Sequence, residues 1–222
     1  PVCWITNAFD RSPAELIWVD SPKWGPLDGT LLNTSYGYGM VYVVPHERVD
    51  GQMQGGVCRL PIDAFPTGVM RGRFHPQDGQ LYACGMFSWA GSRTQPGGFY
   101  RLRYTGNPVH LPIGLNATTE GMRITFSGEL DRASAEDPKN YSVKIWGLKR
   151  TEKYGSDHYD ERALAVSGAT VSADGKTVLV KIPDIRPTWC MEILYRLKSA
   201  DGKSVASAIH NTIHRLGKPR MP

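Results

Sequence analysis

The 222-residue sequence has few cysteines, and none of them forms a metal or haem motif. The four cysteines, Cys3, Cys58, Cys84 and Cys190, are too dispersed for a zinc knuckle, and no Cys-x-x-Cys-His is present for covalent haem. A haem or a metal would therefore have to come from elsewhere. Cys58 and Cys84 both fall in predicted strands, so a cross-link between them and two buried free thiols are both compatible with the sequence.

Long apolar runs and a signal peptide are also missing. No run of about 18 apolar residues occurs, which excludes a membrane-spanning helix. The first residues, Pro1-Val2-Cys3-Trp4, lack the basic start and apolar core of a signal peptide, and a start without Met is typical of a processed chain or of part of a longer one. The net charge of +5 is small, and basic residues cluster only at Arg215, Lys218 and Arg220, so we expect no nucleic-acid partner.

The composition that remains is that of a globular protein rich in turns. Apolar residues make up 41% of the chain, which also holds 24 glycines and 16 prolines, and this favours an all-β protein over a disordered one. At roughly 100 to 150 residues per domain, the length favours two domains.

The most informative stretch runs from Val69 to Gly106. Asp78-Gly79 is typical of a tight hairpin turn, and it separates two strand-like runs at 71–74 and 80–86. After Gly97-Gly98, apolar and basic residues alternate over 99–104, which indicates a third strand.

Residues 24–61 show the same pattern of short strand-like runs separated by glycine-containing turns. Tyr36-Gly37-Tyr38-Gly39 joins two strand candidates, and it leads into a β-branched strand where a phosphate-binding loop would need Gly-Lys-Ser/Thr and a helix. A further short strand ends at Pro61. Short strands at this regular spacing are typical of β-propeller blades, so we expect blades of an incomplete propeller over 1–108.

The texture changes after the proline-containing segment 106–114. Alternating strands are expected at 122–126, 141–146, 177–182, 192–197 and 204–209, with a short polar turn or a single helical turn at 130–137 and a polar loop at 149–162. The last strands flank Asp174-Gly175 and Asp201-Gly202 turns. This pattern predicts a small immunoglobulin-like β-sandwich over 109–222 that ends in the basic tail.

The first half resembles the last blades of the glucose/sorbosone dehydrogenase-like propellers, a family of quinoprotein sugar dehydrogenases. The resemblance is carried by QGGVCRLP, RGRFHPQDGQLY and FYRLRYTG, followed by the trailing β-domain. It implies the C-terminal part of a large secreted or periplasmic bacterial redox protein, in which such a propeller is joined to an immunoglobulin-like domain and elsewhere to a cytochrome c module. It covers 1–106 and, less specifically, 107–216.

The resemblance also implies a cofactor role for Arg71 and Arg73. In the family an Arg-x-Arg pair contacts the carboxylates of pyrroloquinoline quinone (PQQ), and guanidinium groups at i and i+2 of a strand project to the same side. The family's acidic residue after the second arginine is replaced by Phe74. The alternative is that both arginines brace neighbouring blades through carboxylates or carbonyls.

We assign no catalytic residue and no metal ligand to this chain. The family's catalytic histidine would lie in an earlier blade, and neither His46 nor His75 has an adjacent sequence partner that would tune it. His210 and His214 are about 13 Å apart on a strand and its exit, which is too far for one metal ion.

Two functions follow as hypotheses. About 106 residues make roughly two blades, whereas a propeller needs at least four, so we expect the remaining blades or a partner chain to complete the barrel. The first hypothesis is a C-terminal part of a PQQ-dependent sugar dehydrogenase-like oxidoreductase, without a complete active site. The second is a non-catalytic module that binds carbohydrate or protein through exposed aromatics, of which Trp89 and Tyr38 are the candidates for stacking on sugars.

Overall fold

In the computed structural model, which describes residues 1–89 and 92–219, the chain is all-β. Its residues form two compact units, which are described separately below. Unit 1 comprises residues 1–5, 45–58 and 110–222, and unit 2 comprises residues 6–44 and 59–109. Arg220 of the predicted basic tail lies outside the described residues.

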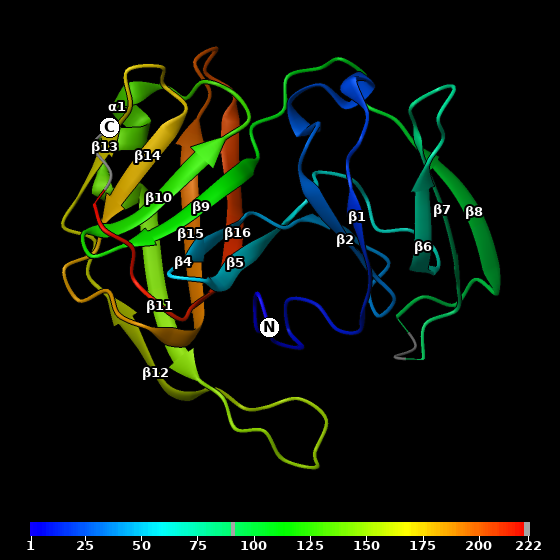
Figure 1. Cartoon of the computed structure of the whole chain (residues 1–222), viewed down its shortest axis with the longest axis horizontal. Helices are drawn as coiled ribbons and strands as arrows, with labels where there is room; N and C mark the ends of the chain where they lie inside the picture. The colour runs from blue at the N-terminus through cyan, green and yellow to red at the C-terminus, as the bar shows by residue number, and fades with distance from the viewer. Residues whose placement is uncertain (90–91, 220–222) are drawn as a thin grey trace. The chain divides into compact units, whose positions relative to one another are not determined.

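Unit 1 is built from two antiparallel sheets that enclose one apolar core (Figure 1). One sheet has the order β13-β14-β10-β9, and the other runs β4-β5-β16-β15-β11-β12. The elements of this unit are β4 (His46–Val49), β5 (Gln52–Arg59), β9 (Pro112–Thr118), β10 (Gly121–Phe126), α1 (Arg132–Glu136), η2 (Pro138–Asn140), β11 (Tyr141–Gly147), β12 (Tyr159–Leu164), β13 (Gly168–Val171), β14 (Thr177–Lys181), β15 (Thr188–Lys198) and β16 (Ser204–Ile213).

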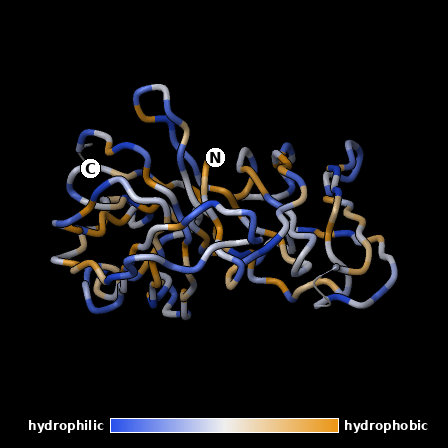
Figure 2. Tube along the Cα trace, turned by 90° about the horizontal axis from the view of Figure 1, so that it is seen from below, coloured by the Kyte–Doolittle hydropathy of each residue, from blue (hydrophilic) through white to orange (hydrophobic). Residues whose placement is uncertain are grey.

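Side-chain alternation decides which face of each strand enters this core. In β15, Met191, Ile193 and Tyr195 are buried, whereas Leu194 and Arg196 between and beyond them are exposed. Apolar and polar stretches accordingly alternate along the trace in Figure 2 instead of separating into long runs. Half-buried strands of this kind stabilise the fold through one face and leave the other free for polar contacts.

Unit 2 contains the strands β1, β2 and β3, which pair antiparallel in that order, and the three-stranded antiparallel sheet β6-β7-β8. Its elements are β1 (Pro13–Trp18), η1 (Pro22–Leu27), β2 (Leu31–Ser35), β3 (Val41–Val43), β6 (Gly68–Phe74), β7 (Leu81–Met86) and β8 (Gly97–Leu102). Strand β6 packs against β1 and β2. The approach is close, since a Cβ on Gly72 would lie 2.8 Å from Cδ1 of Ile17.

The hairpins expected from the Asp-Gly pairs are confirmed. Gly79 and Gly202 take φ angles of +67° and +82°, which side chains disfavour, at the β6–β7 and β15–β16 turns. The helical turn expected at 130–137 is α1, and its N-cap Asp131 accepts a hydrogen bond from the Ser134 N–H at 2.8 Å.

Three sequence expectations need correction or comment. The loop expected at 149–162 ends earlier, because β12 begins at Tyr159 and pairs with β11. Residues 45–58, expected among the blades, form β4 and β5, and β5 pairs with β16 of unit 1. The possible Cys58–Cys84 cross-link is absent, since all four cysteines are free thiols, with Cys58 buried and Cys84 exposed.

The tight packing of β7 predicts a sharp difference between two glycine substitutions in one hairpin. A Cβ on Gly85 would lie 1.6 Å from the carbonyl oxygen of Gly68, whereas a Cβ on Gly97 would have no neighbour closer than 3.8 Å. We expect Gly85→Ala to lower the free energy of unfolding by about 3 kcal/mol and Gly97→Ala by less than about 1 kcal/mol. Urea unfolding of both variants measures this, and equal losses would contradict the packing described.

Candidate functional site

Arg71 and Arg73 lie on the exposed face of the sheet β6-β7-β8. In the strand register, Arg71 is opposite Cys84, which is opposite Phe99, and Arg73 is opposite Tyr82, which is opposite Arg101. Residues opposite one another in a ladder share a face. We call these six residues the arginine face: Arg71, Arg73, Tyr82, Cys84, Phe99 and Arg101.

The arginine face combines cations with aromatic rings. The Tyr82 and Phe99 rings stack with their centroids 5.8 Å apart, and the side chain of Phe99 is 73% exposed. Three guanidinium groups around this ring pair suit an anionic or carbonyl-rich surface with apolar parts. The sequence identified Arg71 and Arg73 but not Arg101, because only the ladder register brings that residue beside them.

Glu15 of β1 already binds one of the two predicted arginines. Its Oε1 accepts a hydrogen bond from Nη1 of Arg73 at 2.6 Å, and its Oε2 accepts one from the Gly72 N–H at 2.8 Å. The guanidinium of Arg71 donates to the neighbouring carbonyl of Met70 at 3.2 Å. The Arg73 contact is thus of the bracing kind that the sequence left open.

These contacts also shift the ionisation of Glu15. Partial burial opposes its charge, but the hydrogen bonds from Arg73 and Gly72 and the charges of Arg73 and Arg71 outweigh this and hold the pKa of Glu15 below its ordinary value. Glu15 is therefore an anion at neutral pH and neutralises part of the charge of the arginine pair. Because Arg73 already binds Glu15, the two guanidinium groups are not both free to bind the carboxylates of PQQ.

His75 lies beside an acidic residue three positions further along the chain. Its Nδ1 lies 3.5 Å from Oδ1 of Asp78, at the β6–β7 turn. Asp78 is occupied by other donors, since it accepts hydrogen bonds from the Tyr82 hydroxyl at 2.7 Å and the Gln80 N–H at 2.9 Å. Both hydrogen bonds lower the pKa of Asp78. This pair therefore closes a turn, and nothing in its geometry marks it as a catalytic base.

The two aromatic candidates for carbohydrate binding are held by separate contacts. The Tyr38 hydroxyl donates to the carbonyl of Asn7 at 2.7 Å, and the residue is only half-exposed. Trp89 is 52% exposed, but its Nε1–H donates to Ser12 Oγ at 3.1 Å and the guanidinium of Arg11 lies 4.7 Å from its ring centre. Stacking of a sugar on Trp89 would compete with Arg11.

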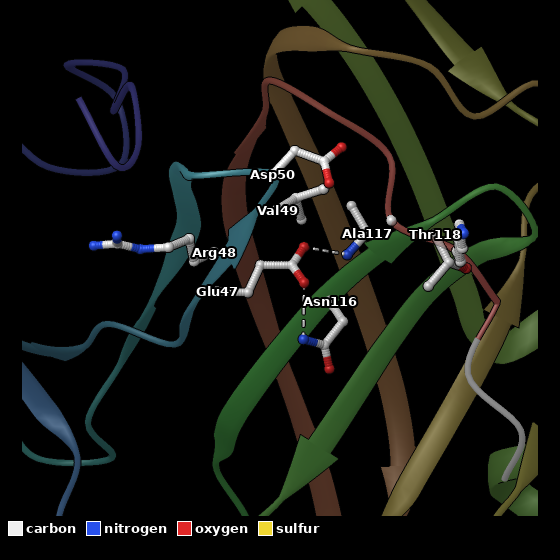
Figure 3. A pocket seen from close by; sticks show the side chains of 9 residues that line it. Glu47, Arg48, Val49, Asp50, Asn116, Ala117 and Thr118 are labelled. Carbon is white, nitrogen blue, oxygen red and sulfur yellow. Dashed lines mark hydrogen bonds between the residues drawn. The ribbon is translucent and has the colours of Figure 1, made fainter.

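A separate cavity of about 220 Å³ lies in unit 1, between β4 and β9 (Figure 3). Glu47 forms its wall, where its Oε1 accepts from the Ala117 N–H at 2.8 Å and its Oε2 from Nδ2 of Asn116 at 2.9 Å. The same carboxylate accepts a third hydrogen bond from Nε2 of Gln54 at 2.8 Å. With both oxygens engaged by the protein, Glu47 acts as a structural tie between strands.

The outer face of β11, β15 and β16 carries an ion network that the sequence did not reveal. Nε2 of His210 lies 3.2 Å from Oε2 of Glu192, and Nζ of Lys144 lies 3.4 Å from Oε1 of the same carboxylate. His210 is buried, and its ring meets the edge of the buried Trp146. Because adjacent strands supply these residues, only the register could have predicted their contact.

The loop before β12 extends this network. His158 stacks on Trp146 at a centroid distance of 4.3 Å and bonds to Glu161 through Nδ1. The hydrogen bond from His158 and the charge of Lys144 hold the pKa of Glu161 below its ordinary value. Each carboxylate of the network faces cationic or imidazole partners, which is the arrangement of a stabilising ion network.

Metal and membrane features can be stated for the described part of the chain. Within residues 1–89 and 92–219, no three His, Cys, Asp or Glu side chains converge to form a metal site. Over the same residues, no helix has the length and apolarity needed to cross a membrane.

Comparison with known proteins gave no match to a family model, to a curated protein or to a solved structure.

The Glu15 contacts predict how its ionisation responds to loss of each arginine. Because Arg73 donates directly to Glu15 and Arg71 acts only through its charge, we expect Arg73→Ala to raise the pKa of Glu15 more than Arg71→Ala does. Carboxyl NMR titration measures both shifts. An equal response would show that the Arg73 hydrogen bond is not formed in solution.

The same pair contributes a small, pH-dependent stabilisation. With its folded-state pKa lowered, Glu15 stabilises the fold above the unfolded-state pKa, and this contribution is lost as the pH falls through the folded-state value. Because Arg73 is largely exposed, the loss amounts to less than about 1 kcal/mol. Arg73→Ala should remove most of it at neutral pH.

Proposed function

We propose that this chain is a non-catalytic, partner-binding part of a secreted or periplasmic quinoprotein-like redox protein of the glucose/sorbosone dehydrogenase-like class. Unit 2 would supply two blades of a β-propeller, and unit 1 would be an immunoglobulin-like domain. The observation that carries the proposal is the arginine face, a sheet face with three arginines and two aromatic rings that a neighbouring blade would cover. The sequence motifs of this same sheet supply the link to the family.

The outward face of β1 supports the same reading. Ile17 points toward β6, so its neighbours Leu16 and Trp18 lie on the opposite side of the strand. They are 60% and 58% exposed. Both outer sides of the two-sheet stack in unit 2 thus present large apolar side chains, as blades in the middle of a propeller would when their neighbours are removed.

The immunoglobulin-like assignment of unit 1 is supported only by the general arrangement of its two sheets. Two antiparallel sheets face each other across one core, and short hairpins connect consecutive strands such as β15 and β16. The proposal needs no catalytic residue on this chain. Abstraction of hydride from a sugar would be carried out by the residues and the quinone of the whole assembly.

We expect the arginine face to be required for assembly. The chain should be isolated, with a tag, from cells that produce it naturally, and its complex weighed by light scattering and identified by peptide sequencing. The expected partner, or contiguous sequence, is a β-propeller with PQQ-dependent aldose oxidation measured by dye reduction. Phe99→Asp should abolish the complex because it places a charge in the buried contact.

Leu194→Asp is the matched control for this experiment. Leu194 is also an exposed apolar strand residue, at 37%, but it belongs to unit 1. It should leave the complex intact, and circular dichroism should show both variants folded. Isolation of the wild-type chain as a lone monomer would overturn the proposal, as would equal losses in the two variants.

A second candidate function is direct binding of PQQ by Arg71 and Arg73. What favours it is the exposure of Arg71 and the presence of Arg101 on the same face, which leaves cationic charge beyond what Glu15 neutralises. Arg71 would contact a quinone carboxylate directly. Arg73 would have to exchange its hydrogen bond with Glu15 for one with the ligand.

Calorimetric titration with PQQ tests this second function on the assembled protein. The double variant Arg71→Ala and Arg73→Ala should weaken binding by at least about tenfold, the loss of one strong charge-assisted contact. Arg196→Ala, which removes an exposed arginine from β15, should leave the affinity unchanged. Unchanged binding in the double variant would leave these arginines with a bracing role only.

A further inference from the structure

The N-terminal segment Pro1–Ile5 is held against the strands of unit 1 by specific hydrogen bonds. The Trp4 N–H donates to Oγ1 of Thr212 at 2.8 Å, and that hydroxyl donates onward to the carbonyl of Trp189 at 2.7 Å. The Gly55 N–H donates to the carbonyl of Val2 at 2.9 Å. The segment therefore contacts β5, β16 and the start of β15, although 187 positions of sequence separate residues 3 and 190.

These contacts bring two of the four thiols to one place. Sγ of Cys3 lies 3.5 Å from the carbonyl oxygen of Trp4, and Sγ of Cys190 lies 3.9 Å from the same oxygen. Cys3 also lies 3.4 Å from the carbonyl of His210. The two sulfur atoms thus share the carbonyl oxygen of Trp4 as a neighbour, and a disulfide between them requires side-chain rotation that brings them to bonding distance.

We propose that Cys3 and Cys190 form a disulfide, which covalently ties the N-terminal segment to β15. The reaction consumes an external disulfide, such as glutathione disulfide or a thiol oxidase of the same chemistry. The Cys3 sulfur attacks it and releases one reduced thiol, and the Cys190 sulfur then displaces the second. Two protein S–H bonds and one external S–S bond are replaced by one protein S–S bond and two external thiols.

The order of these two steps follows from exposure. Cys190 is buried whereas Cys3 is partly exposed, so an oxidant meets Cys3 first and Cys190 acts as the resolving thiol. Burial, joined at Cys3 by the nearby Cys190, raises the pKa of each thiol to about 12. Because the thiolate is the nucleophile, uncatalysed oxidation should be slow at neutral pH and accelerate as the pH rises.

The other two cysteines have different surroundings. Cys58 is buried with its sulfur 3.8 Å from the Tyr195 hydroxyl, and Cys84 is exposed on the arginine face. An exposed thiol would take up glutathione without forming a protein disulfide. The experiment is therefore done with the Cys84→Ser chain, which retains the proposed pair and removes this side reaction.

The test is oxidation of the reduced, folded Cys84→Ser chain by excess glutathione disulfide at mildly alkaline pH. The product is alkylated after unfolding and mapped by peptide mass spectrometry. We expect one linked pair of peptides containing Cys3 and Cys190, with Cys58 alkylated. Three alkylated thiols, or a link that involves Cys58, would overturn the proposal.

Two further measurements separate a specific pair from chance oxidation. In a chain that also carries Cys190→Ser, the resolving thiol is missing, so Cys3 should accumulate as the mixed disulfide with glutathione. Thermal unfolding should show the oxidised parent melting on the order of 5 to 10 °C above its reduced form, a gain that dithiothreitol reverses. If the disulfide forms but does not raise the melting temperature, it does not constrain the N-terminal segment, and the proposal that it ties this segment to β15 would be overturned.

Discussion

The structure of unit 1 depends on a pair of neighbouring polar side chains, Gln54 and Glu47. Gln54 is buried and uses its whole amide: Nε2 donates to Glu47 and to the carbonyl of Arg215, and Oε1 accepts from the N–H groups of His214 and Arg215. Glu47 in turn holds β9 through Asn116 and Ala117. Two side chains from a short segment thus join β9, about 70 residues away, to the residues just after β16, about 160 residues away. Such a network is strong only when every member is satisfied.

This network explains why residues 45–58 belong with the C-terminal unit. By themselves their two strands would form a short two-stranded ribbon, and such a ribbon is only marginally stable in water. Pairing of β5 with β16 and the bonds of Glu47 to β9 place the ribbon within the larger sheet. The chain therefore leaves unit 1 and returns to it twice, so that both segments of unit 2, residues 6–44 and 59–109, are insertions between segments of unit 1.

Local sequence signals predicted much of the strand arrangement, and pairing with a neighbouring strand accounts for what they missed. The turns at Gly79 and Gly202 and the strands around them are encoded by a few adjacent residues. By contrast, β4 and β12 consist largely of polar residues, such as the Glu47 and Glu161 runs, and are strands only because a partner lies beside them.

The candidate sites show the same division. Arg71 and Arg73 were identified because they are two positions apart in a recognisable motif. Arg101 and the approach of Cys3 to Cys190 could not be found this way, because the first depends on ladder register and the second on the path of the N-terminal segment. The His75–Asp78 contact was within reach of local reasoning, since a three-residue offset across a tight turn brings side chains together.

Glu15 has one more consequence, which concerns the backbone of β6. This strand is at the edge of its sheet, and the unpaired N–H groups of an edge strand can pair with a β-strand of another chain. The Glu15 carboxylate occupies the Gly72 N–H, and the Arg73 side chain folds over beside it. Strand addition along this edge is therefore blocked at its middle, which protects the sheet from uncontrolled growth and leaves partners to approach it through its face.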